Sequence, residues 1–305
     1  MGTRGAYDGR QTVGMAPRRP NTMSTAGLDR LGLRRKDAAW LQEALASPTT
    51  RYVPLCNGKV CVAGPPASTV LLETGNWEDV WLLGEAEGTT YVAVELEEDT
   101  WSELPLPEGA RLASLREVAT LLPPLESNML ALAAGLSTWH RTHQFCGACG
   151  APTRSEAAGH VRRCTGCAKE HFPRTDPAII VLVTDGDRCL LARGPQWPAR
   201  FASALAGFVE PGESLEDAVA REVFEEVGIV VDEVDYQSSQ PWPFPASVML
   251  AFRATAATTE ITMDPNEIAD AQWYSREDVA DGIVNLPGSV SIARRLIDDW
   301  IAEGS

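Results

Sequence analysis

The sequence has no run of about 18 consecutive apolar residues, the length that a membrane-spanning helix requires. The apolar stretch at residues 129–136 is far shorter, so we predict no association with a membrane. The first 27 residues also lack the apolar core of a secretory signal, which favours a cytoplasmic protein. Their Arg-rich and acid-poor composition also permits an organelle transit peptide. We find no internal repeat and no coiled-coil pattern.

Basic residues are scarce, with 26 Lys and Arg against 42 Asp and Glu and a net charge of −16. Residues 1–36 nevertheless carry a net charge of +6, so the rest of the chain carries −22. An acidic body argues against a general binder of polyanions, which needs a basic face. Residues 1–27 are rich in Gly, Pro, Thr and Arg and show no periodicity, which predicts a disordered basic tail.

The pattern of apolar residues divides the remaining chain into three parts. Residues 28–142 predict a β-rich domain, with strand patterns at 51–62, 69–73, 80–84 and 90–96 and helical patterns at 37–45, 115–122 and 129–140. Residues 143–172 contain a cluster of four cysteines. Residues 173–305 predict an α+β domain, with a hairpin (178–184 and 188–192), a strand (205–209), a helix (214–227), two strands (229–237 and 247–254) and a last helix (288–302).

Four of the seven cysteines form two CxxC pairs that are separated by 14 residues. Each CxxC turn directs two thiolates to one point, and four thiolates complete a tetrahedral Zn²⁺ site without an open position. The predicted ligands of this structural zinc, one per chain, are Cys146, Cys149, Cys164 and Cys167. Disulfides are the alternative, but they are rare in a reducing compartment. The other cysteines are predicted to be buried thiols: Cys56, Cys61 and Cys189.

Residues 207–229, GFVEPGESLEDAVAREVFEEVGI, predict a capped helix that carries a cluster of acids. Ser214 followed by Asp217 matches a helix N-cap, and Gly228 suits the residue that follows the last turn. The cluster consists of Glu222, Glu225 and Glu226, at positions i, i+3 and i+4. Like charges at this spacing repel by roughly 0.2–0.5 kcal/mol per pair. A solvated acidic face is one interpretation, and a divalent cation held by carboxylate oxygens is the other.

The spacing of this segment resembles the Nudix box at every defined position, including Gly207, Glu213, Arg221 and Gly228. The resemblance implies a hydrolase with an α/β/α sandwich fold that cleaves a nucleoside diphosphate linked to another group. It also implies catalytic metal ions, Mg²⁺ or Mn²⁺, whose ligands are the backbone carbonyl of Ala206 and the side chains of Glu222, Glu225, Glu226 and Glu267. Glu213 and Arg221 match the pair that braces the loop.

A second segment, residues 239–247, has the sequence SQPWPFPAS. Its prolines stiffen a loop, on which Trp242 and Phe244 offer flat surfaces for stacking a heterocycle. A proline-rich surface turn with its aromatic rings in the core is the alternative. The segment resembles the signature of the NAD(H) pyrophosphatases, a Nudix branch in which a four-cysteine zinc ribbon precedes the catalytic domain. The resemblance covers about residues 50–302 and implies substrate contacts from Gln240, Pro241, Trp242, Pro243, Phe244, Pro245, Ala246 and Ser247.

Further positions match this family outside the two motifs. Phe172 matches an aromatic residue that contacts the substrate base, and Ala293 matches a backbone contact to the substrate. Arg116, in the sequence SLR, matches a substrate-contacting arginine. The sequence departs from the family at Gly159, where some relatives have an acid that touches the substrate, so we expect no such acid contact at this position.

The resemblance implies hydrolysis of NADH or NAD⁺ to the nicotinamide mononucleotide and AMP, with Glu225 as the first choice of proton acceptor. Removal of an NAD cap from RNA 5′ ends and hydrolysis of ADP-ribose or NADPH are alternatives. An acidic body would repel a long RNA, so a grip on RNA would be local, through Arg154, Arg162, Arg163 and Arg174. A non-catalytic zinc-ribbon module that binds nucleotide or RNA predicts a broken box, whereas every box acid is present. The family commonly forms homodimers, so we predict a homodimer.

Overall fold

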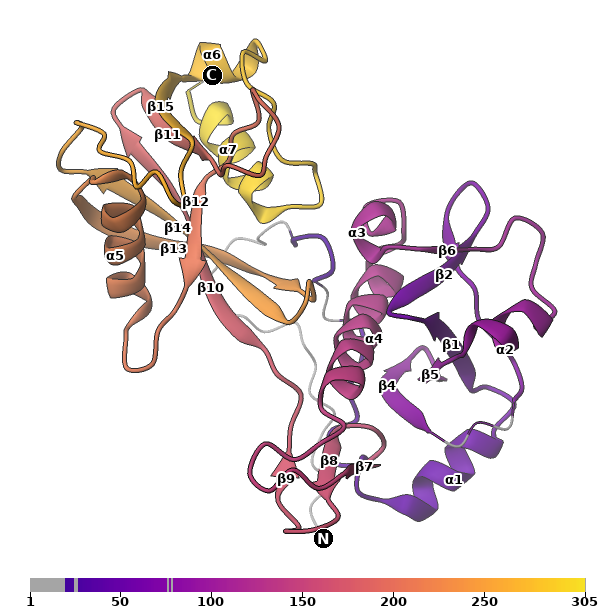
Figure 1. Cartoon of the computed structure of the whole chain (residues 1–305). Coiled ribbons are helices and arrows are strands. Elements are labelled where there is room, and N and C mark those ends of the chain that lie inside the picture. The colour runs from indigo at the N-terminus through magenta and orange to yellow at the C-terminus, as the bar shows by residue number, and fades with distance from the viewer. Residues whose placement is uncertain (1–19, 25–26, 76, 78, 305) are drawn as a thin grey trace, which may run out of the picture.

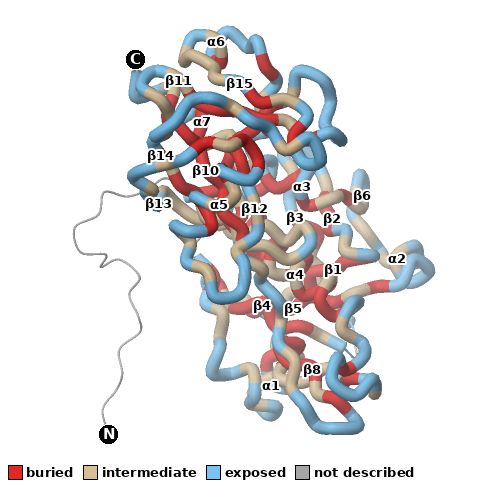
Figure 2. Tube along the Cα trace, turned by 60° about the vertical axis from the view of Figure 1, so that its left-hand side comes forward, coloured by how far each residue is buried: buried red, intermediate tan, exposed pale blue. Residues whose placement is uncertain are grey.

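The computed structural model describes residues 20–24, 27–75, 77 and 79–304, so the first 19 residues of the predicted tail lie outside the described residues. Two sheet-based domains and a small ribbon make up the described chain (Figure 1). Buried residues follow the strands of both sheets, and the peripheral loops are exposed (Figure 2). No helix in the described part combines the length and apolarity needed to cross a bilayer.

The C-terminal domain is a sandwich around a mixed sheet in the order β13-β14-β10-β11-β15, with β12 beside β10. Its strands are β10 (Asp176–Asp185), β11 (Arg188–Arg193), β12 (Leu205–Phe208), β13 (Val231–Trp242), β14 (Ser247–Ala256) and β15 (Asp270–Ser275). Its helices are α5 (Leu215–Val227), α6 (Arg276–Ala280) and α7 (Ile292–Ala302). Along β10, Ile179 and Val181 pack in the core beneath α5, whereas Ile180 and Leu182 pack beneath α7 (Figure 1). This alternation confirms the predicted α+β sandwich.

The N-terminal domain is built on a sheet in the order β3-β2-β1-β5-β4, with β6 beside β2. Its strands are β1 (Arg51–Cys56), β2 (Lys59–Ala63), β3 (Ser68–Thr69), β4 (Val80–Ala86), β5 (Thr89–Glu95) and β6 (Arg111–Ala113). Its helices are α1 (Ala38–Ala46), α2 (Glu98–Glu103), α3 (Leu115–Val118) and α4 (Pro124–Thr142). Val53 and Leu55 face the core that α4 covers, and Tyr52 faces the core beneath α1. Helix α4 therefore packs between this sheet and the C-terminal domain (Figure 1).

The two sheets share one topology, although the sequence shows no repeat. In each, a first hairpin (β1–β2 or β10–β11) is followed by a second (β4–β5 or β13–β14) whose last strand pairs in parallel with the first strand of the domain. The described residues between β3 and β4 contain no helix, whereas α5 lies at the matching place in the C-terminal domain. Our expectation of no internal repeat is therefore wrong for the topology, and among the described residues only the C-terminal copy has a helix at this place.

The ribbon lies between the two domains in the sequence and consists of β7 (Thr153–Glu156), β8 (Val161–Cys164) and β9 (Glu170–His171). Two predicted helices have different bounds, because Pro123 separates α3 from α4 and Pro124 suits the first turn of a helix. The predicted strand at 69–73 shrinks to the two residues of β3.

The prediction of a disordered tail is wrong for residues 20–24, which contact both domains. Met23 is 1% exposed and packs in the N-terminal core, and its carbonyl accepts a hydrogen bond from Asn128 Nδ2 at 2.7 Å. The Asn21 side chain donates to the Ser239 carbonyl at 2.7 Å and accepts from Arg295 Nη1 at 2.8 Å. We call residues 20–24 the strap, because they tie α4 to β13 and α7.

We predict that Asn21→Ala destabilises the protein by about 1–3 kcal/mol, because it leaves buried hydrogen-bonding partners of the amide unsatisfied. Urea unfolding measures this free energy. Gln42→Ala, which removes an exposed amide from α1, is the matched control and should change the free energy by less than about 0.5 kcal/mol. Equal stability of the Asn21 variant and the wild type would show that the strap does not join the domains.

Candidate active site

Helix α5 is held at both ends, as the sequence predicts. The Ser214 hydroxyl accepts a hydrogen bond from the Asp217 amide at 3.1 Å, and Gly228 ends the helix with a positive φ of 72°. A Cβ at Gly228 would lie 3.0 Å from the Cβ of Thr262, so the next segment packs closely against the helix end. These contacts fix the rotation of α5 and hence the direction of its glutamates.

Arg221 and Glu213 form the predicted brace between the helix and the preceding loop. Arg221 Nε lies 2.7 Å from Glu213 Oε1, and Arg221 Nη2 lies 2.8 Å from Glu213 Oε2. The Arg221 guanidinium, with the Glu210 amide, lowers the pKa of Glu213 to about 2. Arg221 also donates to the Phe208 carbonyl at 3.0 Å, which ties the helix to β12.

Glu222 lies against the backbone of β12. A Cβ at Gly207 would be 1.9 Å from the carboxyl carbon of Glu222, so any larger residue at this position would displace that carboxylate. Burial raises the pKa of Glu222, and the neighbouring charges of Glu225 and Glu267 raise it further, against the effect of Arg221. The box glycine therefore makes room for an acid beside the exposed residue Ala206.

Glu226 is the most buried of the acids, at 9% exposure. Its Oε2 is buried and has no hydrogen-bond partner among the described residues. Burial, followed by the charges of Glu222 and Glu267, raises the pKa of Glu226 to about 8. A buried carboxylate without a cation is costly, so this carboxyl group either holds a proton or binds a cation.

The remaining predicted acids, Glu225 and Glu267, lie on different segments of the chain. Glu225 is exposed and accepts a hydrogen bond from Arg221 Nη1 at 3.0 Å. Glu267 belongs to a segment that is tied to the end of α5, because the Asp264 amide donates to the Glu226 carbonyl at 3.1 Å. The structure thus brings Glu267 close enough to act electrostatically on both buried glutamates.

The carboxylates fit a hard divalent cation by donor chemistry and by the unsatisfied oxygen of Glu226. The ligand atoms of these carboxylates nevertheless lie farther apart than the sulfur atoms of the four cysteines. Among the described residues, only the four cysteines place the ligand atoms of three or more His, Cys, Asp or Glu residues within 4.8 Å of one another. Repulsion among the glutamates, and the bonds of Arg221 to Glu222 and Glu225, account for this spread.

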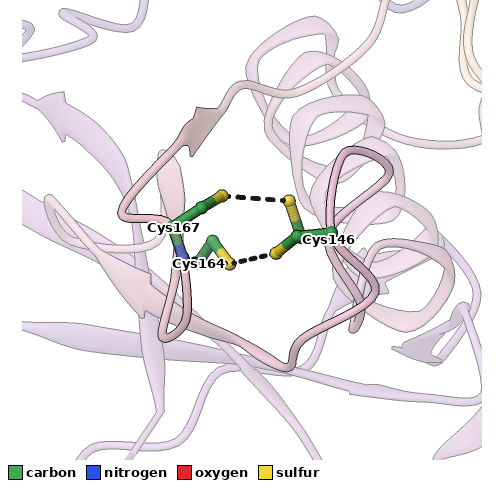
Figure 3. A group of neighbouring side chains, drawn as sticks. Cys146, Cys164 and Cys167 are labelled. Carbon is green, nitrogen blue, oxygen red and sulfur yellow. Dashed lines mark hydrogen bonds between the residues drawn. The ribbon is translucent and has the colours of Figure 1, made fainter.

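The four ribbon cysteines form a compact cluster (Figure 3). The Sγ atoms of Cys146 and Cys167 are 3.7 Å apart, and those of Cys149 and Cys164 are 3.4 Å apart, well beyond a disulfide bond. The backbone amide of Cys167 is the main cause that lowers the pKa of Cys164 to about 6. A thiolate-rich cluster of this kind fits a structural zinc. The other three cysteines are buried, as predicted: Cys56, Cys61 and Cys189.

The signature segment forms the tip of the β13–β14 hairpin. Our prediction of a loop is wrong for its first residues, because β13 continues to Trp242 and only residues 243–246 form the turn. The rings of Trp242 and Phe244 meet edge to face at 5.1 Å and pack partly against the N-terminal core. The Arg116 guanidinium lies 5.1 Å and 4.8 Å from the two ring centroids. The two aromatic rings are therefore half-buried, and the positively charged guanidinium of Arg116 lies beside both of them.

Gln240 is 1% exposed, and its side-chain amide forms hydrogen bonds to backbone groups. Its Nε2 donates to the carbonyls of Val290 and Thr22, and its Oε1 accepts from the Ile292 amide at 2.9 Å. In this arrangement Gln240 joins the hairpin to α7 and to the strap. Ala293 is also buried in the first turn of α7, whereas Phe172 is 60% exposed.

The sequence analysis missed Phe208, which is 59% exposed beside Gly207. Pairing aligns Phe208 with Ala178 and Ala178 with Met249, so the three side chains share one face of the sheet. Exposed large aromatic residues next to charged groups are typical of binding sites. The signal in the sequence was an aromatic residue inside the box, directly after the required glycine.

The arginines suggested for a local grip on RNA are mostly engaged. Arg162 is buried and donates to Thr153 and to His140 Nδ1. Arg163 bonds Glu156 and Glu170, and Arg154 bonds Glu156. Arg174 pairs with Asp176 through two nitrogens but is largely exposed. The ribbon therefore presents no unpaired arginine cluster among the described residues.

Three family models match the chain in the order of its structural parts. Residues 38–139 match an NADH pyrophosphatase-like rudimentary NUDIX domain, residues 141–172 an NADH pyrophosphatase zinc ribbon domain, and residues 174–299 a NUDIX domain. Proteins named NAD-capped RNA hydrolase NudC are similar to it. That of Stutzerimonas stutzeri is 43% identical over 72% of this chain and 76% of its own length, and that of Mycobacterium bovis is 38% identical over 92% and 94%. The chain belongs to the NADH pyrophosphatase family of NUDIX hydrolases.

We predict that Glu226→Gln stabilises the protein at high pH when Mg²⁺ and Mn²⁺ are absent and the ribbon metal is retained. The wild-type carboxyl has a folded pKa of about 8, above its ordinary value of 4.5, so wild-type stability falls as the pH rises from 4.5 to 8. The neutral amide escapes this loss, which is worth roughly 2–4 kcal/mol. Urea unfolding at pH 5 and pH 9 measures it.

Glu225→Gln is the matched control, because Glu225 lies one residue away but is exposed. Its stability should follow the pH profile of the wild type. If Glu226→Gln also follows that profile, the buried carboxyl does not carry the raised pKa.

Proposed function

We propose that the protein hydrolyses the pyrophosphate bond of NADH and NAD⁺ to give the nicotinamide mononucleotide and AMP. The observation that carries the proposal is the buried, unsatisfied carboxylate of Glu226 beside Glu222, on a helix that Arg221 and Glu213 brace. An anionic diphosphate needs a cation between itself and such acids. The family of the chain supports the same substrate class.

The proposed metal ligands are the backbone carbonyl of Ala206 and the side chains of Glu222, Glu225, Glu226 and Glu267. Mg²⁺ or Mn²⁺, when bound there, would neutralise the diphosphate and increase the acidity of a bound water. Glu225, which is exposed, would accept the proton of the attacking water. Arg221 keeps Glu213, Glu222 and Glu225 in position through its bonds to all three.

Exposed and half-buried aromatic side chains would receive the rings of the substrate. Phe208 and Phe172 are exposed, and each offers a ring face for stacking. Arg116, Trp242 and Phe244 form the second wall, and Ala293 would contribute backbone. Gln240 would act indirectly, by fixing the hairpin that carries the other signature residues, Pro241, Pro243, Pro245, Ala246 and Ser247.

Removal of an NAD cap from RNA is part of the same proposal, since the names of the relatives state that activity for them. ADP-ribose and NADPH remain alternative substrates of the same chemistry. We also propose a cytoplasmic homodimer and a division into residues 28–142, 143–172 and 173–305. The matched ranges of the three family models support that division.

The test is an initial-rate assay with NADH and Mg²⁺ or Mn²⁺, with the products resolved. We expect the wild type to form AMP and the reduced mononucleotide in equal amounts. Glu222→Gln should lower kcat/KM by about 100-fold or more, because it removes a carboxylate that would balance the cation. Glu216→Gln, an exposed acid in the first turn of the same helix, is the control and should change the rate less than about twofold. Activity of Glu222→Gln near that of the wild type would overturn the metal assignment.

A further inference from the structure

A cavity of about 280 Å³ lies beneath the signature hairpin. It is bounded by α4, by the hairpin and by the segment that links the ribbon to β10. Its lining includes the apolar residues Trp242, Leu132 and Pro173. Two positively charged residues, Arg30 and Arg174, also line it. No Asp or Glu is present among the described residues that line it. In a protein with a net charge of −16, this is a local region of positive charge with an apolar wall.

Arg30 is a half-buried cation without a counter-ion. Its Nη2 donates to Asn128 Oδ1 at 3.0 Å, and none of the ion pairs between described residues involves it. The Arg35 side chain donates to the Arg30 carbonyl, so a second guanidinium lies nearby. Burial, and then the charge of Arg35, lower the pKa of Arg30. A bound anion would offset both effects on the pKa, because an opposite charge stabilises the protonated guanidinium.

The chain segment before residue 38 fixes the position of Arg30. Met23 of the strap and Leu28 are both buried, so they anchor the backbone before Arg30. Asn128 binds both the Met23 carbonyl and the Arg30 guanidinium. The matched family domains begin at residue 38, so Arg30 belongs to none of them.

One residue that lines the cavity, Ser247, lies on the same face of the sheet as Phe208. Ser247, which lines the cavity, pairs with Trp242 and with Asp176, and it lies two residues before Met249 on β14. Met249 and Phe208 flank Ala178 on that face. Ser247 and Phe208 are therefore two strands apart, at about 4.8 Å per strand. They are also two residues apart along the strands, at about 3.3 Å per residue. An extended dinucleotide can span this distance.

We propose that Arg30, with Arg174, binds a phosphate group on the adenosine ribose of the substrate. The inference rests on the proposed hydrolysis of a nicotinamide dinucleotide. It places the adenosine half beneath the hairpin and the nicotinamide half at Phe208. Two sources carry such a phosphate: the 3′-phosphodiester that joins an NAD cap to RNA, and the 2′-phosphate of NADPH.

The chemistry of the cavity matches this ligand. Guanidinium groups bind phosphate through paired N–H donors, and such bonds are among the strongest in proteins. Arg174 is exposed and can exchange Asp176 for a phosphate, whereas Arg30 has no carboxylate to give up. Because the rest of the body repels RNA, one local site of this kind would bind only the first phosphate after the cap.

The experiment compares kcat/KM for NADH, NADPH and a short NAD-capped RNA in the full-length protein. Arg30→Gln should lower kcat/KM for a substrate with the ribose phosphate by about tenfold or more, and for NADH by less than about threefold. Arg30→Lys should recover part of the loss. Arg111→Gln, which removes an exposed arginine from β6 outside the cavity, is the matched control and should leave all three substrates unchanged.

A binding measurement separates this proposal from the proposed function. Adenosine 3′,5′-bisphosphate, adenosine 2′,5′-bisphosphate and AMP are titrated without divalent metal into the wild type and Arg30→Gln. The wild type should bind one bisphosphate more tightly than AMP, and Arg30→Gln should lose this preference. A preference for the 3′,5′ isomer would identify the RNA phosphodiester as the natural ligand, and a preference for the 2′,5′ isomer would identify NADPH. Equal binding of all three, or equal losses for NADH and the phosphate-bearing substrates, would overturn the proposal. A wild type that binds the bisphosphate but leaves NADH intact would overturn the proposed function alone.

Discussion

The charge of one buried carboxyl group determines how this site is built. Glu226 is buried on α5, next to two other acids and, among the described residues, without a partner for one of its oxygens. Residues 207–229 carry seven acids and one arginine, and that arginine is already committed to the brace with Glu213. The segment therefore favours a bound proton or a bound divalent cation. The acidic balance of the chain, which at first argues against a general binder of polyanions, favours a bound cation in this segment.

The surrounding structure holds these acids at fixed positions. Gly207 leaves room for Glu222, Gly228 lets the next segment bring Glu267 near the helix, and Arg221 ties the loop to the helix. The β13–β14 hairpin is fixed from three sides, by Gln240 to α7, by the strap to β13, and by the aromatic pair to the N-terminal core. The N-terminal domain has the same topology but, among its described residues, no helix at the place of α5, and its core holds this hairpin in position.

Local patterns in the sequence predicted most of what depends on local physics. The spacing of the cysteines predicted the cluster, and the capping residues and glutamate spacing of α5 predicted its bounds and its acidic face. Features that depend on distant contacts were missed. The strap has no periodicity, so its composition indicated disorder, while its order comes from partners about 100 to 270 residues away. The same holds for Arg30 and for the buried amide of Gln240, whose roles come from tertiary contacts.

Calorimetric titration of Mg²⁺ or Mn²⁺ between pH 6 and 9, in buffers of different ionisation enthalpy, tests the central claim most directly. Because the pKa of Glu226 is about 8 in the metal-free protein, the carboxyl group is mostly protonated at pH 7 and must lose its proton to bind a cation. The account predicts release of about one proton per chain at pH 7, and an affinity that rises with pH and levels off above about pH 8. An affinity that is constant from pH 6 to 9, without proton release, would contradict it.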